Sequence, residues 1–272
     1  MPTSIVLQLQ AEANGRFQGA TGRAVHGFWY QQWEKTDPAI TQLLHANNGP
    51  QPFTLSPLMG LPHPQQGQTA VSLKQTAWIR FTALHDELAQ SLLQNWIIHL
   101  PAQIELAGIP WSVQTIALAP DQHKWAGQTS YEKLLAVSPT KKWQFHLHTP
   151  TAFRSKSGQL PFPQPHSLIN SLLRRWQAFS PRPLPADGLI DRVQESVLIS
   201  AYQLKTIPVR HGRRLEIGCV GSITLDGRQL TPADHALITT LSQYAFYCGI
   251  GRHTTQGMGM TINNEGVSFR LE

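Results

Sequence analysis

Four glycines bracket a polar, basic insert near the C-terminus, in the segment GIGRHTTQGMG. The glycines are Gly249, Gly251, Gly257 and Gly259, and Arg252 and His253 are the basic residues between them. Glycine lets a backbone adopt positive φ and approach another backbone closely, and clustered amide N–H groups attract anions. The spacing therefore predicts a loop that lies against a sugar-phosphate chain.

Two other interpretations of this loop are weaker. The phosphate-binding loops of nucleotide enzymes follow a strand and precede a helix, whose first amides face the anion. This loop instead follows a helix expected to end at Cys248, and the chain contains no G-K-[ST] pattern. A helix C-cap at Gly249 with a plain connector explains one glycine and leaves the other three without a reason.

Acid and base chemistry in this chain rests on histidine rather than on carboxylates. RNA carries its own nucleophile, the 2′-hydroxyl, so its cleavage needs only a base and an acid, and histidine suits both roles near neutral pH. The carboxylates are scattered from Glu12 to Glu272, and Asp86-Glu87 is the only adjacent pair. This distribution disfavours a two-metal nuclease.

The remaining histidine patterns are less informative. His146 and His148 alternate along a predicted strand and face one side of it, but no third metal ligand accompanies them. We expect solvated or hydrogen-bonded side chains there. His253 and Thr255 match the H-x-T pattern of the two-histidine phosphoesterases, but that family needs a second copy, which the chain lacks.

A basic cluster lies between two predicted strands in the second half of the chain. Arg210, Arg213 and Arg214 fall within five residues, so they form the tip of a hairpin. Like charges at this density repel one another unless a polyanion screens them. Arg154 and Lys156 are further candidates for binding a nucleic acid.

The first half of the chain predicts the elements that hold the candidate histidines. A strand over residues 4–10 is followed by a helix over 23–35, in which His26, Tyr30 and Trp33 share one face. Asp37-Pro38 opens a short helix that ends at His45. Strands over 52–58 and 70–81, a helix over 84–98 and an extended segment over 104–118 complete the ferredoxin-like order βαββαβ.

The second half repeats this pattern. We expect a strand over 143–148, a helix over 166–179, strands over 197–204 and 215–225, a helix that ends at Cys248, and a last strand over 257–262. The fold class is therefore α+β, with two tandem ferredoxin-like, RRM-like domains over residues 1–138 and 139–272.

Composition sets the broad class. The 272 residues suffice for two domains, and a hydrophobic content of 41% excludes a disordered chain. Lys and Arg number 22 against 16 Asp and Glu, giving a net charge of +6 and a preference for an anionic partner such as nucleic acid or a membrane surface. Two cysteines form no disulfide framework or C-x-x-C site, and no stretch is apolar enough to span a membrane. We expect a cytoplasmic protein.

The glycine-rich segment resembles the signature of the CRISPR repeat-RNA processing endoribonucleases of the RAMP superfamily. That signature is Gly, hydrophobic, Gly, five variable residues with basic members, Gly, hydrophobic, Gly, after the last helix, and residues 249–259 fit it throughout. The tandem ferredoxin-like order agrees with the resemblance. So does the region of Leu44-His45, Gly49-Pro50 and residues 53–58.

The resemblance implies an active site on the first helix and the segment after it. It implies His45 as a catalytic residue, Tyr30 as its helper and His26 as a second candidate base, with the rank of the two histidines open. Each has a plain alternative, since His26 and Tyr30 could pack in the core and His45 could cap a helix. Gln51 stands where some members have a lysine, so Lys35 or Lys156 could supply the missing cation.

The resemblance also implies the reaction and the partners. We expect a metal-independent endoribonuclease without cofactors that cuts precursor CRISPR RNA within the repeat and leaves 2′,3′-cyclic phosphate and 5′-hydroxyl ends. The glycine-rich loop and the basic hairpin would bind the repeat RNA. The alternatives are a non-catalytic RAMP subunit that binds guide RNA in a multi-subunit effector complex, and a general RNA-binding protein. The sequence leaves both monomer and homodimer open.

Overall fold

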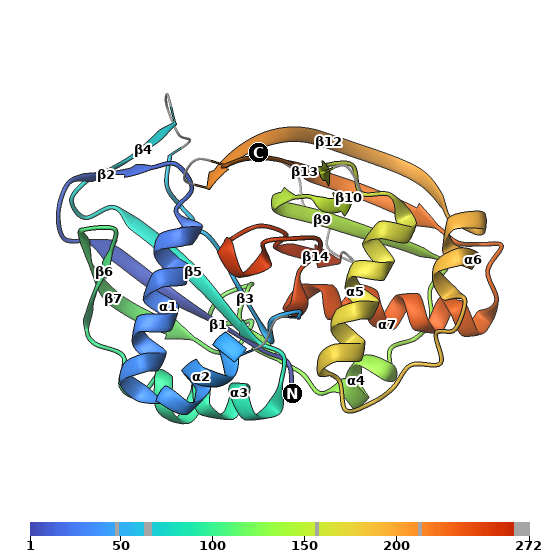
Figure 1. Ribbon diagram of the computed structural model, residues 1–272, viewed down its shortest axis with the longest axis horizontal. Helices are drawn as coiled ribbons and strands as arrows, with labels where there is room; N and C mark the ends of the chain where they lie inside the picture. The colour runs from blue at the N-terminus through green and yellow to red at the C-terminus, as the bar shows by residue number, and fades with distance from the viewer. Residues whose placement is uncertain (47–48, 63–66, 156–157, 212–213, 264–272) are drawn as a thin grey trace. The chain divides into compact units, whose positions relative to one another are not determined.

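The computed structural model describes residues 1–46, 49–62, 67–155, 158–211 and 214–263 (Figure 1). The chain forms two compact units. The first unit contains Met1–Thr129, Val209–Leu215 and His253–Met258, and the second contains Ser130–Pro208, Glu216–Arg252 and the chain from Gly259 onward. Each unit is built around its own antiparallel sheet.

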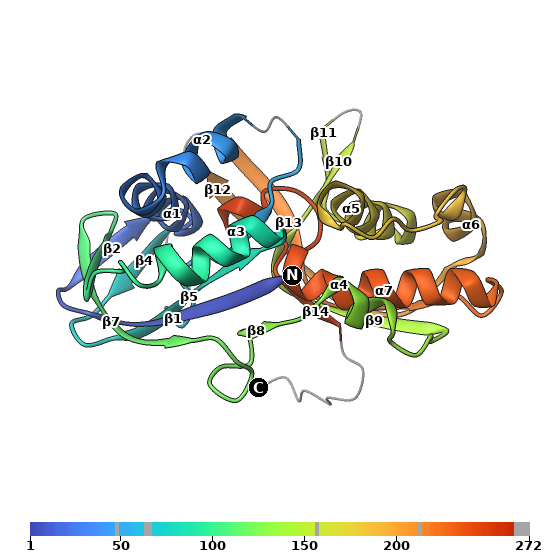
Figure 2. The same ribbon diagram turned by 90° about the horizontal axis from the view of Figure 1, so that it is seen from below.

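The first unit is a ferredoxin-like sheet covered by helices on one face. Its elements are β1 (Thr3–Ala11), β2 (Gly15–Gln18), α1 (Gly22–Thr36), α2 (Pro38–Ala46), β3 (Phe53–Leu55), β4 (Gln68–Val71), β5 (Thr76–Ala83), α3 (Asp86–Ser91), the π-helical turn η1 (Leu92–Trp96), β6 (Gln103–Leu106), β7 (Ile109–Ala117), β8 (Gly127–Gln128) and the 3₁₀ turn η2 (Thr254–Gln256). The strand order β3-β5-β1-β7-β6 is the one that βαββαβ connectivity produces, so the predicted architecture is confirmed. Figure 2 shows α1, α2 and α3 on the same face of this sheet.

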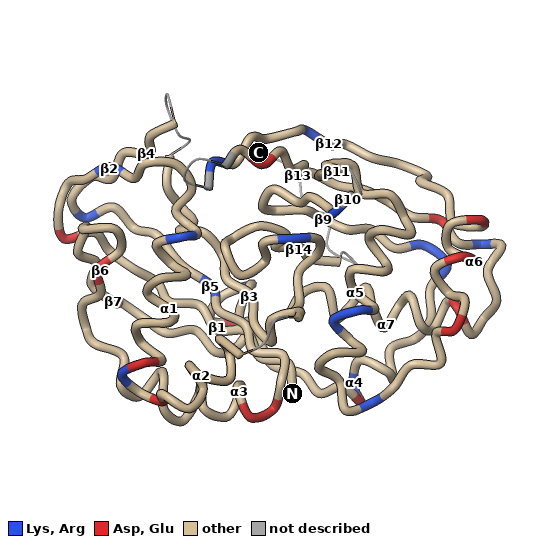
Figure 3. The backbone as a smooth tube through the Cα atoms, viewed as in Figure 1, with Lys and Arg blue, Asp and Glu red and all other residues tan. Residues whose placement is uncertain are grey.

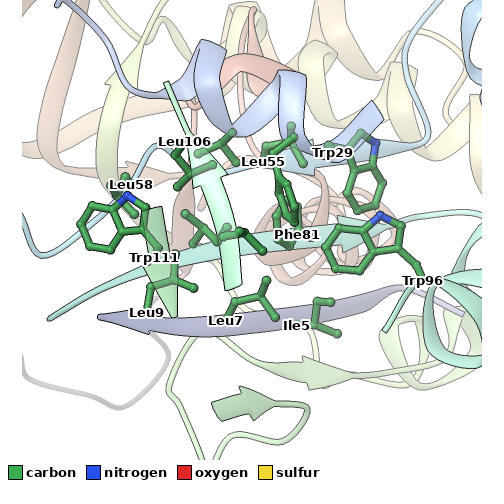
Figure 4. Close-up of a cluster of buried hydrophobic side chains, with 14 of the residues drawn as sticks. Ile5, Leu7, Leu9, Trp29, Leu55, Leu58, Phe81, Trp96, Leu106 and Trp111 are labelled. Carbon is green, nitrogen blue, oxygen red and sulfur yellow. The ribbon is translucent and has the colours of Figure 1, made fainter. Parts of the chain in front are cut away.

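The core of the first unit is an aromatic cluster between α1 and the sheet (Figure 4). Ile5, Leu7 and Leu9 point to the core from β1, as their alternation predicts. The Trp29 ring from α1 stacks on Phe81 of β5, with centroids 5.1 Å apart. Large buried rings contribute most of the hydrophobic stabilisation of such a core, so α1 is held firmly on the sheet.

The opposite face of β1 is buried as well, although the alternation of apolar residues along this strand is typical of a half-buried strand. Ser4 and Val6 are inaccessible to solvent. Ser4 Oγ donates to the Trp125 carbonyl at 2.5 Å and accepts a hydrogen bond from Arg80 Nε at 2.7 Å. The Arg80 guanidinium lies over the Trp125 ring at 5.2 Å, so a buried charge obtains both hydrogen bonds and a cation–π partner.

Two predicted elements of the first unit are interrupted. The strand predicted over residues 70–81 stops at Val71 and resumes at Thr76, because Lys74 turns the chain with a φ of 66°. The helix predicted over 84–98 is α-helical only to Ser91 and continues as the π-helical turn η1. The extended segment over 104–118 is a hairpin that turns at Ala107 and Gly108, both with positive φ.

The second unit repeats the ferredoxin-like connectivity. Its elements are α4 (Tyr131–Leu135), β9 (Lys142–Thr151), β10 (Phe153–Ser155), β11 (Gly158–Leu160), α5 (Pro165–Phe179), α6 (Leu189–Ser196), β12 (Leu198–His211), β13 (Arg214–Asp226), α7 (Pro232–Cys248) and β14 (Thr261–Asn263). The strand order is β12-β13-β9-β14, and α5 packs against α7. Thr231 caps α7, its Oγ1 accepting a hydrogen bond from the Asp234 N–H at 3.1 Å.

The last strand is shorter than predicted. β14 begins at Thr261 rather than at Gly257, because Gly257 and Gly259 have φ values of 91° and 73°. A strand cannot accommodate such angles. The sequence analysis also missed α4, α6 and the β10–β11 hairpin. Within the described residues, no helix has the length and apolar character needed to cross a membrane.

Candidate active site

His26, Tyr30 and His45 lie together on the surface of the first unit. The His26 and Tyr30 rings, one helical turn apart on α1, have centroids 5.0 Å apart. The His45 ring, near the end of α2, stacks on the Tyr30 ring, with centroids 4.6 Å apart and an interplanar angle of 27°. Phe53 of β3 lies beside both α1 rings. Both imidazoles therefore lie against one phenol ring.

Backbone from the C-terminal part of the chain orients His26. Its Nδ1 lies 2.8 Å from the carbonyl oxygen of Thr255 in η2. A carbonyl can only accept, so Nδ1 carries the proton and donates it to Thr255. In the neutral imidazole the lone pair is then on Nε2, which is the arrangement a general base needs.

Burial tunes the titration of the two α1 residues. It lowers the pKa of His26 below the ordinary value of 6.5, and the positive charges of His45 and Arg23 act in the same direction. The hydrogen bond to Thr255 opposes this shift. Burial also raises the pKa of Tyr30, so the phenol keeps its proton at neutral pH. Tyr30 can donate a hydrogen bond but cannot serve as a base.

Two glycine contacts explain how η2 reaches the cluster, beside α1 and β3 (Figure 1). A Cβ on Gly22, at the start of α1, would overlap the carbonyl of Gln256. A Cβ on Gly257 would lie 2.8 Å from the Pro57 nitrogen. The absence of side chains at these two positions lets the Thr255 carbonyl meet His26.

Asp37 holds the short helix that carries His45. Its Oδ1 accepts from the Ile40 N–H at 3.4 Å, as a predicted N-cap should. Its Oδ2 accepts from Ser91 Oγ at 2.6 Å, which ties the start of α2 to the end of α3. His45 therefore sits on a helix that is fixed at its N-terminal end.

The first part of the glycine-rich loop is packed in the second unit. Gly251 has a φ of 81°, and a Cβ there would overlap the Ala152 carbonyl. Its N–H donates to Ser171 Oγ at 2.9 Å, and its carbonyl accepts from Arg175 at 2.7 Å. Gly249 ends α7 with a φ of 64°. Gly251, Gly257 and Gly259, which has a φ of 73°, thus have packing or backbone reasons of their own, beyond the C-cap at Gly249.

One of the two basic residues of the loop, Arg252, forms an ion pair within the protein. Arg252 Nη1 lies 3.5 Å from the Glu216 carboxylate in the second unit. His253 has a φ of 56° and immediately precedes η2 in the first unit. Gly259 returns to the second unit, where its N–H donates to the Pro150 carbonyl at 3.0 Å.

The other predicted site residues fall at separate places. Arg210 is exposed near the end of β12, Arg154 is exposed on β10, Lys35 is exposed at the end of α1, and Gln51 is half-buried before β3. Arg214 begins β13. Arg213 and Lys156 lie outside the described residues.

In the described part of the chain, no three His, Cys, Asp or Glu side chains are grouped to hold a metal. The His146 and His148 rings do face one side of β9, with centroids 5.2 Å apart.

Sequence reasoning missed the residues that support the site. Thr255 was considered only as part of a rejected motif, and Arg23 was not considered. The sequence analysis assigns no role to Arg175, whose guanidinium binds the Gly251 carbonyl. A short loop between two glycines was the available signal for Thr255, because glycine spacing marks where backbones approach.

Together, two ferredoxin-like sheets and a glycine-rich loop after the last helix define a protein of the RAMP-like fold. Residues 1–136 match the family model of the CRISPR Cas6 N-terminal domain, and residues 145–261 match that of the CRISPR-associated endoribonuclease Cas6. The chain belongs to the Cas6 family, which confirms the resemblance seen in the sequence.

Individual relatives agree with this assignment. A solved Cas6 product complex is 28% identical, with a TM-score of 0.84 over 97% of this chain and 100% of that one. Thermus thermophilus Cas6 is 26% identical, with a TM-score of 0.75 over 97% of this chain and 98% of that one. The CRISPR-associated endoribonuclease Cas6 of Mycobacterium tuberculosis is 30% identical over 121 residues, 44% of this chain and only 38% of that relative.

Proposed function

We propose that this protein is an endoribonuclease that cuts precursor CRISPR RNA within the repeat and so produces guide RNA. Membership of the Cas6 family, matched over residues 1–136 and 145–261, is the observation that carries this proposal. The similar Cas6 product complex supports an RNA ligand. The net charge of +6 is consistent with a polyanionic substrate.

The proposed reaction uses the RNA's own 2′-hydroxyl as the nucleophile. A base removes the 2′-hydroxyl proton, the 2′-oxygen bonds to phosphorus, and the bond from phosphorus to the 5′-oxygen breaks. An acid gives a proton to that leaving oxygen. The products are a 2′,3′-cyclic phosphate and a 5′-hydroxyl, and no metal is required.

We assign the base role to His26. The Thr255 carbonyl fixes its Nδ1–H, so Nε2 is the atom that accepts the proton. Burial lowers its pKa, which keeps the imidazole neutral and ready to act at the pH of a cell. His45 is then the acid, because it is exposed beside Tyr30 and can meet the leaving oxygen.

Tyr30 contacts both imidazoles, and its protonated phenol can donate a hydrogen bond to the phosphate. The glycine-rich loop and the basic hairpin would hold the rest of the RNA through phosphates and 2′-hydroxyls, as RNA helices require.

Incubation of the protein with labelled repeat RNA in excess EDTA, followed by mapping of the product ends, tests the proposal. We expect cutting at one position with a 2′,3′-cyclic phosphate and a 5′-hydroxyl. A deoxyribose immediately upstream of the scissile bond should abolish cutting and preserve binding. A requirement for magnesium, or cleavage of the deoxy substrate, would refute the mechanism. Tight binding without any cutting would instead indicate a non-catalytic RAMP subunit.

A further inference from the structure

The first unit contains a cavity of about 570 Å³ that includes none of the three residues of the candidate active site. It lies between α1, β2, the β6–β7 hairpin and the end of β12. Three arginines, two phenylalanines and two glutamines line this cavity, together with small residues of α1 and the segment before it. Its volume falls within the range of small-molecule sites, roughly 300 to 1,000 Å³.

The cavity is strongly basic. Arg16, Arg23 and Arg210 line it together with one carboxylate, that of Glu105. Among the described residues, none of these three arginines forms an ion pair with a carboxylate. Figure 3 shows basic residues on β2 and at the start of α1. Converging guanidinium groups are the preferred protein ligands of a phosphate, which they bind through paired hydrogen bonds.

Gly27 leaves the floor of the cavity open. It lies in the interior of α1, where glycine costs about 1 kcal/mol of helix stability relative to alanine. A Cβ built on Gly27 meets nothing within 4 Å, so packing does not require glycine there. Gly22 on the same helix is different, because a neighbouring backbone occupies its side-chain space. The open space at Gly27 therefore serves the cavity rather than the fold.

The remaining lining suits a nucleobase. Ala20, just before α1, and Ala24 on α1 keep the wall beside Gly27 low, and the largely buried rings of Phe17 and Phe28 add a small apolar surface. The exposed side chains of Gln18 and Gln31 can both donate and accept hydrogen bonds, as base edges require. An apolar wall, amide groups and arginines together match a nucleotide better than a free phosphate or an acidic peptide.

We infer that this cavity binds one unpaired nucleotide of the RNA substrate, with its phosphate on the arginines and its base against the open floor of α1. The inference rests on the proposed function for the identity of the ligand. Positions 23, 27 and 31 of α1 face the cavity, whereas His26 and Tyr30 lie on the adjacent face of the same helix. The bound nucleotide is therefore only a few nucleotides from the scissile bond.

Because the cavity is separate from the acid and base, its occupant should affect RNA affinity and positioning rather than the chemical step. Arg23 connects the two places, since its charge lowers the pKa of His26.

Filling the cavity tests the inference. In Gly27→Leu the new side chain enters open space, so the fold should be retained, which circular dichroism checks. With repeat RNA carrying the deoxyribose at the scissile position, we expect at least about five-fold weaker binding, the lower end of the loss for one stacked base. Ala178→Leu, at an exposed position of α5, is the matched control and should bind like the wild type.

Removal of the charges tests it independently. The double variant Arg23→Gln and Arg210→Gln should weaken binding and reduce its salt dependence, because fewer counterions are released. Arg182→Gln, which removes a charge paired with Glu132 in the second unit, is the control. If Gly27→Leu fails to fold, the double arginine variant and its Arg182→Gln control still test whether the cavity binds RNA.

Crosslinking locates the nucleotide directly. Thiouridine placed at successive positions of the RNA should crosslink at one position to the tryptic peptide 17–23, which holds Phe17 and no member of the candidate active site. Wild-type affinity in Gly27→Leu and in the arginine variants, or crosslinks confined to other peptides, would overturn the inference. If the wild-type protein neither binds nor cuts repeat RNA, the proposed function itself falls, and with it the identity of the ligand.

Discussion

The Nδ1 of His26 lies 2.8 Å from the carbonyl oxygen of Thr255, a residue 229 positions later in the chain. The polar insert of the glycine-rich loop, which we propose binds RNA, therefore also has a role within the protein. It fixes the ring orientation and the tautomer of a histidine on the first helix. The loop and the candidate base can be disturbed together by a change at either place.

Gly22 and Gly27 should respond in opposite ways to the same substitution. Gly22→Ala forces the backbone at Gln256 away from α1, so we expect lower stability and loss of the His26 orientation. Gly27→Ala meets no neighbour and should raise stability by up to about 1 kcal/mol. Urea unfolding of the two variants measures both effects, and equal shifts of the same sign would contradict this account of η2.

His45 should matter for cleavage and little for binding. Its exposed ring contacts Tyr30, so His45→Ala removes an acid without opening the core. We expect the rate of cleavage to fall about 100-fold or more, with RNA affinity within a few-fold of the wild type. His99→Ala, which removes another exposed histidine of the first unit, should cut normally. Unchanged cleavage in His45→Ala would remove this residue from the mechanism.

The acidic side of the pH–rate profile should report His26. A base acts only when neutral, and burial lowers the pKa of His26. As the pH falls, the free enzyme therefore keeps its base beyond the ordinary histidine value, and kcat/KM should decline with a midpoint below 6.5. Cleavage rates at subsaturating RNA give this profile. A decline centred at or above 6.5 would exclude the buried imidazole as the base.

Local periodicity was sufficient to predict much of this molecule. The spacing of His26 and Tyr30 placed them on one helix face, and the Asp37-Pro38 pair placed His45 at the end of the next helix. The repeated order of strands and helices predicted both sheets, because ferredoxin-like connectivity leaves few alternatives.

What the sequence could not predict depends on contacts between distant segments. The approach of Thr255 to His26 has no local signature in the sequence. The need for glycine at position 22 has none either, because Gly22 has the sequence context of an ordinary turn residue. The role of Arg175 was equally hidden, because a solvated arginine and one that binds the Gly251 carbonyl have the same helical spacing. The interruption at Lys74 depends on a positive φ that non-glycine residues seldom adopt.

Glu216 restrains a basic residue of the glycine-rich loop, and its removal should strengthen RNA binding. The Glu216 carboxylate lies 3.5 Å from Arg252 and is itself buried, so the pair is only weakly screened by solvent. Glu216→Gln keeps the size of the side chain and frees the Arg252 charge for a phosphate. We expect tighter binding at low salt and a salt dependence steeper by about one counterion. Arg252→Gln should have the opposite effect, and the double variant should resemble it. If Glu216→Gln leaves the salt dependence unchanged while Arg252→Gln weakens binding, the ion pair does not compete with RNA.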